Sequence, residues 1–424
     1  MIVSAMICGS PFFLPGDADN IVKYSKLCEK KQEQSFLEKQ ENENKRGALL
    51  YLDGRDSIIW RKDNRKDRKT AMEKTLWEIY NDTQLAELET LTADYKDFLD
   101  AGKTERECVT EVIRLAEKEG YVDLNQKDTL QAGDKVYLDW MGKSIVLFQI
   151  GEDPLENGMN ILGAHVDSPR LDLKQNPLYE ESGFAYFDTH YYGGIKKYQW
   201  VTLPLAIHGV VVKKDGTKFN VVIGEKEEDP IFAITDLLPH LGSKQMEKTA
   251  ASVIEGEALD ILVGSAPLCG EEKDAVVAHI LKLLKETYDI EKEDLMSAEL
   301  EIVPAGKARD CGLDRSMVMA YGQDDRVCAF TSLMAMFHTE NKKRTSCCIL
   351  VDKEEIGSVG ATGMQSRFFE NAVAEILDKC GEFSELKLRR AMANSTMISS
   401  DVGAAFDPMH AMSLIHISEP TRHS

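Results

Sequence analysis

Residues 348–363 read CILVDKEEIGSVGATG, and this stretch decides the class of fold. Its first four residues form an apolar run of the length typical of a buried strand. Helical patterns lie on either side, at residues 327–338 and 367–377, and another short apolar strand is expected at residues 397–398. Because strands that alternate with helices are typical of an α/β sheet, the sequence predicts an α/β core.

Upstream, the sequence predicts further elements of the same core. Apolar residues recur at steps of three or four over residues 85–98, and a capping box at residues 104–107 starts a second helix. Two strand-like runs within residues 136–150 predict a β-hairpin, and residues 160–164 predict a short buried strand. The folded body is therefore expected to begin near Met72.

The middle of the chain has a different pattern. Residues 171–306 contain several strand-like runs and one helical pattern, so we expect a mostly β insertion. The catalytic α/β domain is then expected to consist of residues 72–170 and 307–412. The predicted strands of the insertion are residues 206–212, 219–223 and 300–303, and its predicted helix is residues 275–284.

Both ends of the chain depart from these patterns. Residues 1–71 are mostly rich in charged and amide side chains, which indicates a disordered or non-native leader. Residues 413–424 read SLIHISEPTRHS and are expected to be an atypical tail.

Composition excludes several classes of protein. The net charge of -21 argues against binding to nucleic acid or to an anionic membrane, since either partner needs a basic face. No run is long and apolar enough to cross a bilayer, and no basic segment precedes the apolar start, so a signal peptide is not expected. The nine cysteines are scattered without a C-x-x-C pair, which indicates reduced thiols. We therefore expect a cytoplasmic protein.

Four clusters of acidic and histidine residues fall where a predicted strand ends or a helix begins. Ligands of an open α/β sheet bind at the carboxyl ends of its strands. Each cluster also has an ordinary structural explanation, such as a packed histidine, a helix cap, a solvated face or a turn. The clusters contain His165 with Asp167, Asp324 with Asp325, Glu354 with Glu355, and Asp401.

Together, the four clusters point to metal chemistry. They supply the imidazole and carboxylate ligands that divalent ions take in proteins, and two ions about 3.5–4 Å apart can activate water for hydrolysis. Asp167 lies two residues after His165 and can fix the tautomer of its imidazole. In the glutamate pair, one residue can bind metal while its neighbour takes a proton from water.

Residues 72–412 resemble the aspartyl aminopeptidase family of cocatalytic zinc exopeptidases. The segments GAHVDSPRLDLK, YGQDDRVCAF, DKEEIGSVGATG and ISSDVGAAFDP occur in the family's order and spacing. The resemblance implies an enzyme that removes N-terminal residues, acidic ones in the family's manner, from peptide substrates with two Zn²⁺ ions. It implies that His165 and Asp401 hold one zinc, that Asp324 bridges the two ions, that Glu355 binds the second, and that Glu354 is the general base.

The resemblance also carries expectations about assembly and about the end of the chain. In the family, the insertion forms dimers that assemble into a hollow dodecamer, and His240 matches a histidine that reaches the active site of a neighbouring subunit. A final histidine of the family completes the second zinc site, and His416 in the tail is not expected to replace it. The second zinc site is therefore expected to be incomplete and the chain to be a poor enzyme.

Two other functions remain open from the sequence. One is a related two-metal deacylase that acts on small acylated amino acids, against which the long insertion favours the peptidase. The other is a non-catalytic subunit, since an incomplete metal site does not prevent the insertion from assembling.

Overall fold

The computed structural model describes residues 76–340, 343–403 and 409, which fall into two compact units. The smaller unit contains residues 76–90 and 338–340, with α2 (Leu76–Ile79) and the first part of α3 (Asp82–Ala101). Asn81 and Gln84 exchange backbone-to-side-chain hydrogen bonds of 3.1 and 3.0 Å, which cap the start of α3. The expected leader (1–71) and tail (413–424) lie outside the described residues.

The larger unit contains a mixed six-stranded sheet in the order β1-β2-β3-β13-β4-β14. The β2–β3 hairpin is antiparallel, and β13 pairs antiparallel with β3 but parallel with β4, which in turn pairs parallel with β14. The strands are β1 (Val122–Asp123), β2 (Lys135–Trp140), β3 (Ser144–Gln149), β4 (Asn160–His165), β13 (Ser346–Val351) and β14 (Thr396–Ser399).

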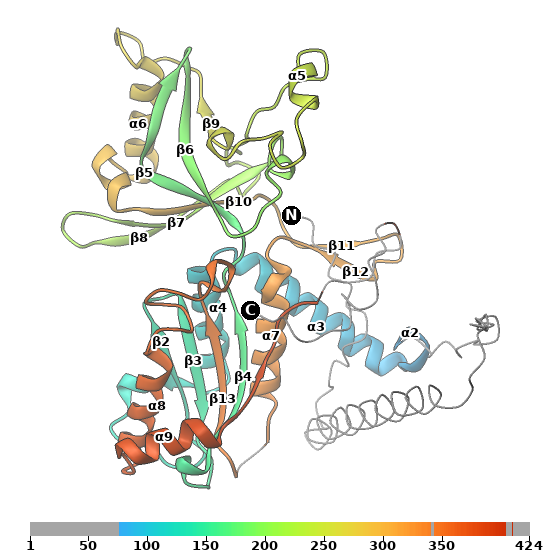
Figure 1. The fold of residues 1–424 in the computed structure, drawn as a ribbon, viewed down its shortest axis with the longest axis vertical. Helices are drawn as coiled ribbons and strands as arrows, with labels where there is room; N and C mark the ends of the chain where they lie inside the picture. Colours follow the sequence, from blue (N-terminus) through green and yellow to red (C-terminus); the bar gives the residue numbers. More distant parts are fainter. Residues whose placement is uncertain (1–75, 341–342, 404–408, 410–424) are drawn as a thin grey trace, which may run out of the picture. The chain divides into compact units, whose positions relative to one another are not determined.

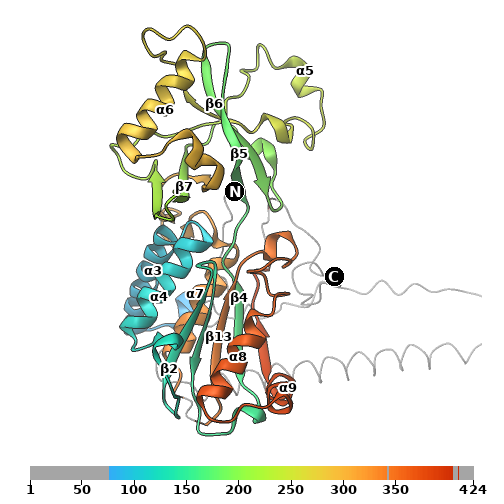
Figure 2. The same cartoon turned by 90° about the vertical axis from the view of Figure 1, so that its left-hand side faces the viewer.

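Helices cover both faces of this sheet (Figure 2). On one face, α4 (Glu105–Lys118), α7 (Gln323–Phe337) and the second half of α3 share a core with β3, β4 and β13. On the other face, α8 (Phe368–Lys379) and α9 (Glu385–Asn394) pack on a separate apolar core. The predicted α/β core is confirmed, and so is the capping box between Thr104 and Glu107 at the start of α4.

A second six-stranded sheet is formed by the chain between β4 and β11 (Figure 1). It is antiparallel throughout, in the order β8-β7-β10-β5-β6-β9, and α6 (Ala275–Tyr288) contacts β5, β6 and β9. Its two longest strands, β5 and β6, were not predicted. The strands are β5 (Arg170–Glu181), β6 (Phe184–Tyr192), β7 (Leu205–Val212), β8 (Lys218–Ile223), β9 (Ile261–Gly264) and β10 (Glu299–Pro304).

Short elements complete the described chain. A small hairpin, β11 (Arg309–Cys311) with β12 (Met317–Met319), follows the second sheet in the chain. The short helix α5 (Ser243–Met246) lies in the connection between β8 and β9. None of the helices in the described part of the chain combines the length and the apolar character needed to span a membrane. The 3-10 helices are Leu124–Gln126, Leu155–Asn157, Lys197–Gln199, Gly256–Ala258, Lys292–Ser297 and Glu354–Ile356.

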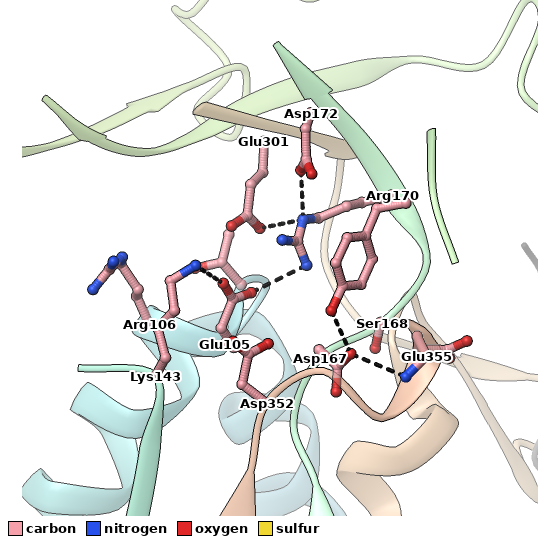
Figure 3. Close-up of polar contacts among 12 residues, drawn as sticks. Glu105, Arg106, Lys143, Asp167, Ser168, Arg170, Asp172, Glu301, Asp352 and Glu355 are labelled. Atoms are coloured by element: carbon pink, nitrogen blue, oxygen red, sulfur yellow. Dashed lines mark hydrogen bonds and ion pairs between the residues drawn. The ribbon is translucent and has the colours of Figure 1, made fainter. Parts of the chain in front are cut away.

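Buried ion pairs join the start of α4 to the second sheet (Figure 3). The Glu105 carboxylate is fully buried and lies 2.8 Å from Lys143 Nζ and 3.2 Å from Arg170 Nη1. Arg170 Nε also lies 3.1 Å from Glu301 Oε2 and 2.8 Å from Asp172 Oδ1. Because an uncompensated buried charge is costly, these pairs hold the base of β5 against α4.

A second polar contact between α4 and the same sheet is made by His208 of β7. Its Nδ1 lies 2.8 Å from Glu107 Oε1 and its Nε2 lies 3.2 Å from Glu225 Oε1. Lys103 Nζ contacts the same Glu225 oxygen at 2.6 Å. The imidazole is buried between two carboxylates, so it stabilises this junction most when it is protonated.

Candidate active site

The candidate site lies at the carboxyl ends of three neighbouring parallel strands. His165 is the last residue of β4 and pairs in register with Val351, the last residue of β13. Ser399 ends β14 opposite Gly163 of β4. Because the three strands run parallel, the residues that follow them meet at one edge of the sheet. This geometry brings together clusters that span more than two hundred residues of sequence, from His165 to Asp401.

Three of the predicted metal ligands converge at this edge. The ligand atoms of His165, Asp324 and Asp401 all lie within 4.8 Å of one another. His165 Nε2 is 3.4 Å from Asp324 Oδ1, and the imidazole is buried while the two carboxylates are accessible. One imidazole nitrogen and two carboxylates form the type of donor set that zinc takes in catalytic sites, so these residues fit the ion.

Asp167 is the centre of the hydrogen bonds behind this group (Figure 3). Its carboxylate accepts bonds from the Tyr192 hydroxyl at 2.7 Å and from the backbone N–H groups of Glu354 and Glu355 at 3.1 and 3.2 Å. His165 Nδ1 lies 3.0 Å from the Asp167 carbonyl oxygen and 3.3 Å from its Oδ1. Asp167 thus turns Nε2 of the imidazole toward Asp324 and also anchors the glutamate segment.

The two glutamates occupy different places. They form the short 3-10 helix Glu354–Ile356, and Glu354 Oε2 lies 3.8 Å from His165 Nε2. Glu355 lies beside Gly193, where an added Cβ would come within 3.2 Å of Glu355 Cβ. Gly193 has φ +73, so both its conformation and this close approach favour glycine. Among the described residues, the group of ligand atoms within 4.8 Å includes neither glutamate.

His240 belongs to the chain segment that forms the second sheet, and not to the strand ends of the first sheet that carry the candidate site. It is in an exposed stretch, residues 235–241, directly before α5. It does not belong to either group of described residues whose donor atoms are close enough to hold a metal ion. The expected role of His240 in a neighbouring subunit therefore stays a prediction.

The charges of the site favour a bound cation. Burial alone would lower the pKa of His165, but its hydrogen bonds to Asp167 and Asp324 outweigh burial and raise that pKa to about 11. Burial, followed by the charge of Asp324, raises the pKa of Glu355 to about 7. Burial likewise raises the pKa of Asp325 to about 7. A proton on His165 thus stands where a metal ion would supply positive charge, and metal binding has to displace it.

The loop that carries Asp324 is held by hydrogen bonds to the segment that follows β4. The Ser168 hydroxyl donates a 2.7 Å hydrogen bond to the Asp324 carbonyl oxygen, and the Tyr321 hydroxyl donates one of 3.0 Å to the Pro169 carbonyl. The peptide bond between Asp324 and Asp325 is cis. Asp324 itself has non-helical backbone angles at the start of α7. The hydrogen bonds made by Ser168 and Tyr321 therefore restrain the loop that presents the Asp324 side chain.

A second acidic group nearby has a different character. Carboxylate oxygens of Glu105, Glu299 and Glu301 lie within 4.8 Å of one another. Lys143 pairs with Glu105 and Glu299, and Arg170 pairs with Glu105 and Glu301. Because protein cations already neutralise these carboxylates, this group is an ion-pair network and not a metal site.

Tyr192 was not predicted as a partner of the site. A signal for its strand existed, since residues 184–192 read FAYFDTHYY and aromatic residues favour strands. The contact between its hydroxyl and Asp167 depends on how the second sheet meets the first. Local patterns do not contain that information.

An α/β sheet whose strand ends gather an imidazole and several carboxylates, with one more carboxylate beside them, defines the class of metal-dependent hydrolases. The profile of the family described as "Aminopeptidase I zinc metalloprotease (M18)" matches residues 98–419. The chain belongs to this family and is a zinc metalloaminopeptidase. The resemblance found in the sequence is therefore confirmed.

Relatives with known names or structures agree with this assignment. The chain is 62% identical over 340 residues to the "Probable M18 family aminopeptidase 1" of Clostridium acetobutylicum, covering 79% of this chain and 73% of the relative. The crystal structure of aminopeptidase I from the same species is 58% identical, covers 80% of this chain and 74% of that chain, and has a TM-score of 0.72. The Thermotoga maritima M18 aminopeptidase structure is 44% identical with the same coverage and a TM-score of 0.76. These similarities confirm the zinc-exopeptidase-like α/β fold.

Proposed function

We propose that this aminopeptidase releases single N-terminal residues from peptides by two-zinc activation of water at the site formed by His165, Asp324 and Asp401. The observation that carries this proposal is the convergence of their ligand atoms within 4.8 Å. Glu354 is the general base of the proposed reaction, and its Oε2 lies 3.8 Å from His165 Nε2. The Glu354 carboxylate therefore lies beside the proposed ligand atoms, whereas the Asp167 carboxylate is held by several hydrogen bonds.

When bound, the zinc ions polarise the scissile carbonyl and lower the pKa of the attacking water. Glu354 takes the proton from that water and passes it to the leaving amine, which needs a carboxylate within reach of both groups. Its backbone N–H is held by Asp167, so the segment that carries the base is fixed to the residue that orients His165. Asp167 thereby couples the geometry of the base to that of the metal ligand.

The two zinc positions differ in the ligands that the described residues offer. The ligand atoms of His165, Asp324 and Asp401 lie within 4.8 Å of one another, so these residues would hold the first zinc, and Asp324 would also be a ligand of the second. Glu355 is the further ligand of the second position in the proposed arrangement. Because zinc usually takes at least three protein ligands and the described residues offer the second position only Asp324 and Glu355, we propose that these two residues alone hold zinc there more weakly than the first position does.

The proposed substrates are peptides with an acidic N-terminal residue. This preference rests on the resemblance to aspartyl aminopeptidases. Lys353 is a partly exposed cation that directly precedes the proposed base, and its Nζ lies 3.6 Å from Asp352 Oδ2. A comparison of kcat/KM for aspartyl, glutamyl and leucyl substrates of one length tests the preference, and a higher value for the leucyl substrate would contradict it.

We also propose a homo-oligomer in which the insertion (residues 171–306) forms dimers that build a dodecamer. The stretch around His240 exposes several apolar side chains, which is unusual for a surface that faces only water. A yeast aminopeptidase 1 structure that shares the fold at 22% identity is described as a dodecamer. The exposed residues are Leu237, Leu238, Leu241 and Met246.

In this assembly, His240 of one subunit serves the active site of another. Light scattering tests the oligomer, and the variant His240→Ala tests the histidine. A monomer with full peptidase activity would contradict both parts of this proposal.

The domain limits and the location in the cell are proposals of the same kind. All six strands of the second sheet lie within residues 170–304, which supports an insertion between catalytic segments 72–170 and 307–412. The net charge of -21 supports a cytoplasmic protein that binds neither nucleic acid nor membrane.

The variant Glu354→Gln tests the proposed reaction. It keeps the size of the side chain and removes the group that accepts the proton, so we expect turnover to fall by about a hundredfold or more. Zinc content should stay as in the wild type because Glu354 is not a proposed ligand. Turnover within about threefold of the wild type, with zinc bound, would exclude Glu354 as the base.

A further inference from the structure

We propose that Tyr192, on the second sheet, is a positioning residue of the zinc site and acts through Asp167. This inference rests on the proposed function, because it takes His165 to be a zinc ligand. The tyrosine comes from a strand that belongs to the insertion and not to the catalytic sheet. The second sheet therefore contributes a residue that helps to shape the zinc site.

The fold delivers Tyr192 to the site in a defined position. It is the last residue of β6 and pairs in register with Arg170, the first residue of β5. Its side chain is buried, and its hydroxyl donates a 2.7 Å hydrogen bond to Asp167 Oδ2. A hydrogen bond to a carboxylate is stronger than one between neutral groups, so this contact restrains the acceptor.

The ring of Tyr192 is itself held by cations. The Arg170 guanidinium lies 3.9 Å from the ring centroid, and Lys353 Nζ lies 5.7 Å from it. Arg170 is fixed by buried ion pairs to Glu105 and Glu301 (Figure 3). The ring cannot shift without disturbing these pairs, so the hydroxyl is presented to Asp167 from a rigid support.

The consequence for the metal follows from the partners of Asp167. The same carboxylate that accepts the Tyr192 bond lies 3.3 Å from His165 Nδ1 and anchors the backbone of Glu354 and Glu355. Without the hydroxyl, Oδ2 keeps only the Glu355 N–H, so the carboxylate is held less firmly and the imidazole depends more on its 3.0 Å contact with the Asp167 carbonyl oxygen. Loss of a group that orients a metal ligand typically lowers metal affinity or activity by about 10–100-fold. Tyr192 acts one bond further out, so we expect about a tenfold effect.

A simple packing role makes a different prediction. If only the aromatic ring matters, Tyr192→Phe keeps the contact with Arg170 and leaves the zinc site unchanged. A matched control is Tyr137→Phe, since Tyr137 is also buried and donates a 2.9 Å hydrogen bond to Glu117. That bond lies on β2 and involves none of the proposed site residues.

The experiment measures zinc affinity by chelator competition and the visible spectrum of the Co²⁺-substituted protein, with thermal unfolding as a check of folding. We expect Tyr192→Phe to weaken zinc binding by about tenfold and to shift the Co²⁺ bands. Tyr137→Phe should match the wild type in both readouts, within about twofold in affinity. In the background Asp167→Ala, which has no acceptor for the Tyr192 hydroxyl, the change at Tyr192 should have no further effect on zinc affinity, because both act through one contact.

Wild-type zinc affinity and an unchanged Co²⁺ spectrum in folded Tyr192→Phe would overturn the proposal. If that variant does not fold, 3-fluorotyrosine at position 192 keeps both ring and hydroxyl while altering the strength of the bond, and an unchanged Co²⁺ spectrum would then overturn it. A different observation would show that the proposed zinc site itself is wrong. In that case Asp324→Ala would bind zinc as tightly as the wild type, whatever the result at Tyr192.

Discussion

The change Asp167→Asn tests how the site is organised, because it keeps the size of the side chain and removes its charge. The wild-type carboxylate accepts bonds from the Tyr192 hydroxyl at one oxygen and from the backbone N–H groups of Glu354 and Glu355. An asparagine offers a single acceptor oxygen, and its NH₂ group must face at least one of these donors. The variant therefore leaves a buried N–H or O–H group without an acceptor.

The size of the effect follows from these bonds. A hydrogen bond to a charged group contributes about 1.5–3 kcal/mol, and the remaining bonds become neutral and weaker. We therefore expect the free energy of unfolding to fall by about 2–4 kcal/mol. Since the Nδ1 side of His165 also loses its charged partner, zinc affinity should fall by about 10–100-fold.

The assay is chemical unfolding of the metal-free protein together with zinc binding by chelator competition. Asp260→Asn is the matched control, because Asp260 accepts bonds from the Tyr179 hydroxyl at 2.6 Å and the Thr189 N–H at 3.1 Å. The control should lose stability but keep its zinc affinity. A folded Asp167→Asn protein that binds zinc within about twofold of the wild type would refute the role given to Asp167.

Three further predictions concern protons and backbone. Burial would lower the pKa of His208 but its carboxylate partners raise it, so its stabilisation is present below about pH 6.5 and is lost as pH rises through the raised value. Urea unfolding should therefore show that the free energy of unfolding falls between pH 6 and pH 9 in the wild type by more than in His208→Gln. An equal fall in the two proteins would contradict this. Since His165 has a pKa of about 11 in the metal-free site, zinc binding at pH 7 should release at least one proton, which calorimetry in two buffers measures, and no release would be the contrary result. Gly193→Ala should displace Glu355 and weaken the second zinc by about tenfold while the first stays tight, and equal loss at both positions would point to a general disturbance.

Local patterns predicted the elements of the catalytic sheet well. The capping box at Thr104, the hairpin of β2 and β3, and the apolar runs of β4 and β13 each depend on residues close in sequence. The parallel pairing of β4 with β13 and β14 then follows from the α/β class, and it places His165 beside the segment that follows Val351. This part of the site was therefore accessible from the sequence.

Contacts between the two sheets were not accessible in the same way. β5 alternates between polar and apolar residues only over its first five residues, RLDLK, and the QNP that follows breaks the pattern, so the full strand is not marked in the sequence. Arg170 and Glu105 are buried because oppositely charged partners, including each other, neutralise them at the junction, and no local pattern indicates such a network. The bond from Tyr192 to Asp167 depends on the same junction, which is why the sequence indicated the clusters that contain His165, Asp324 and Asp401 but not the contact made by Tyr192.

Zinc titration of the metal-free chain, with chelator competition, tests the central proposal most directly. We expect one tightly bound zinc per chain, weakened by about a hundredfold or more in His165→Ala, Asp324→Ala and Asp401→Ala, since each removes one of three ligands. A second, weaker zinc should be lost in Glu355→Ala. Wild-type affinity for the first zinc in any one of the three ligand variants would contradict the proposed site.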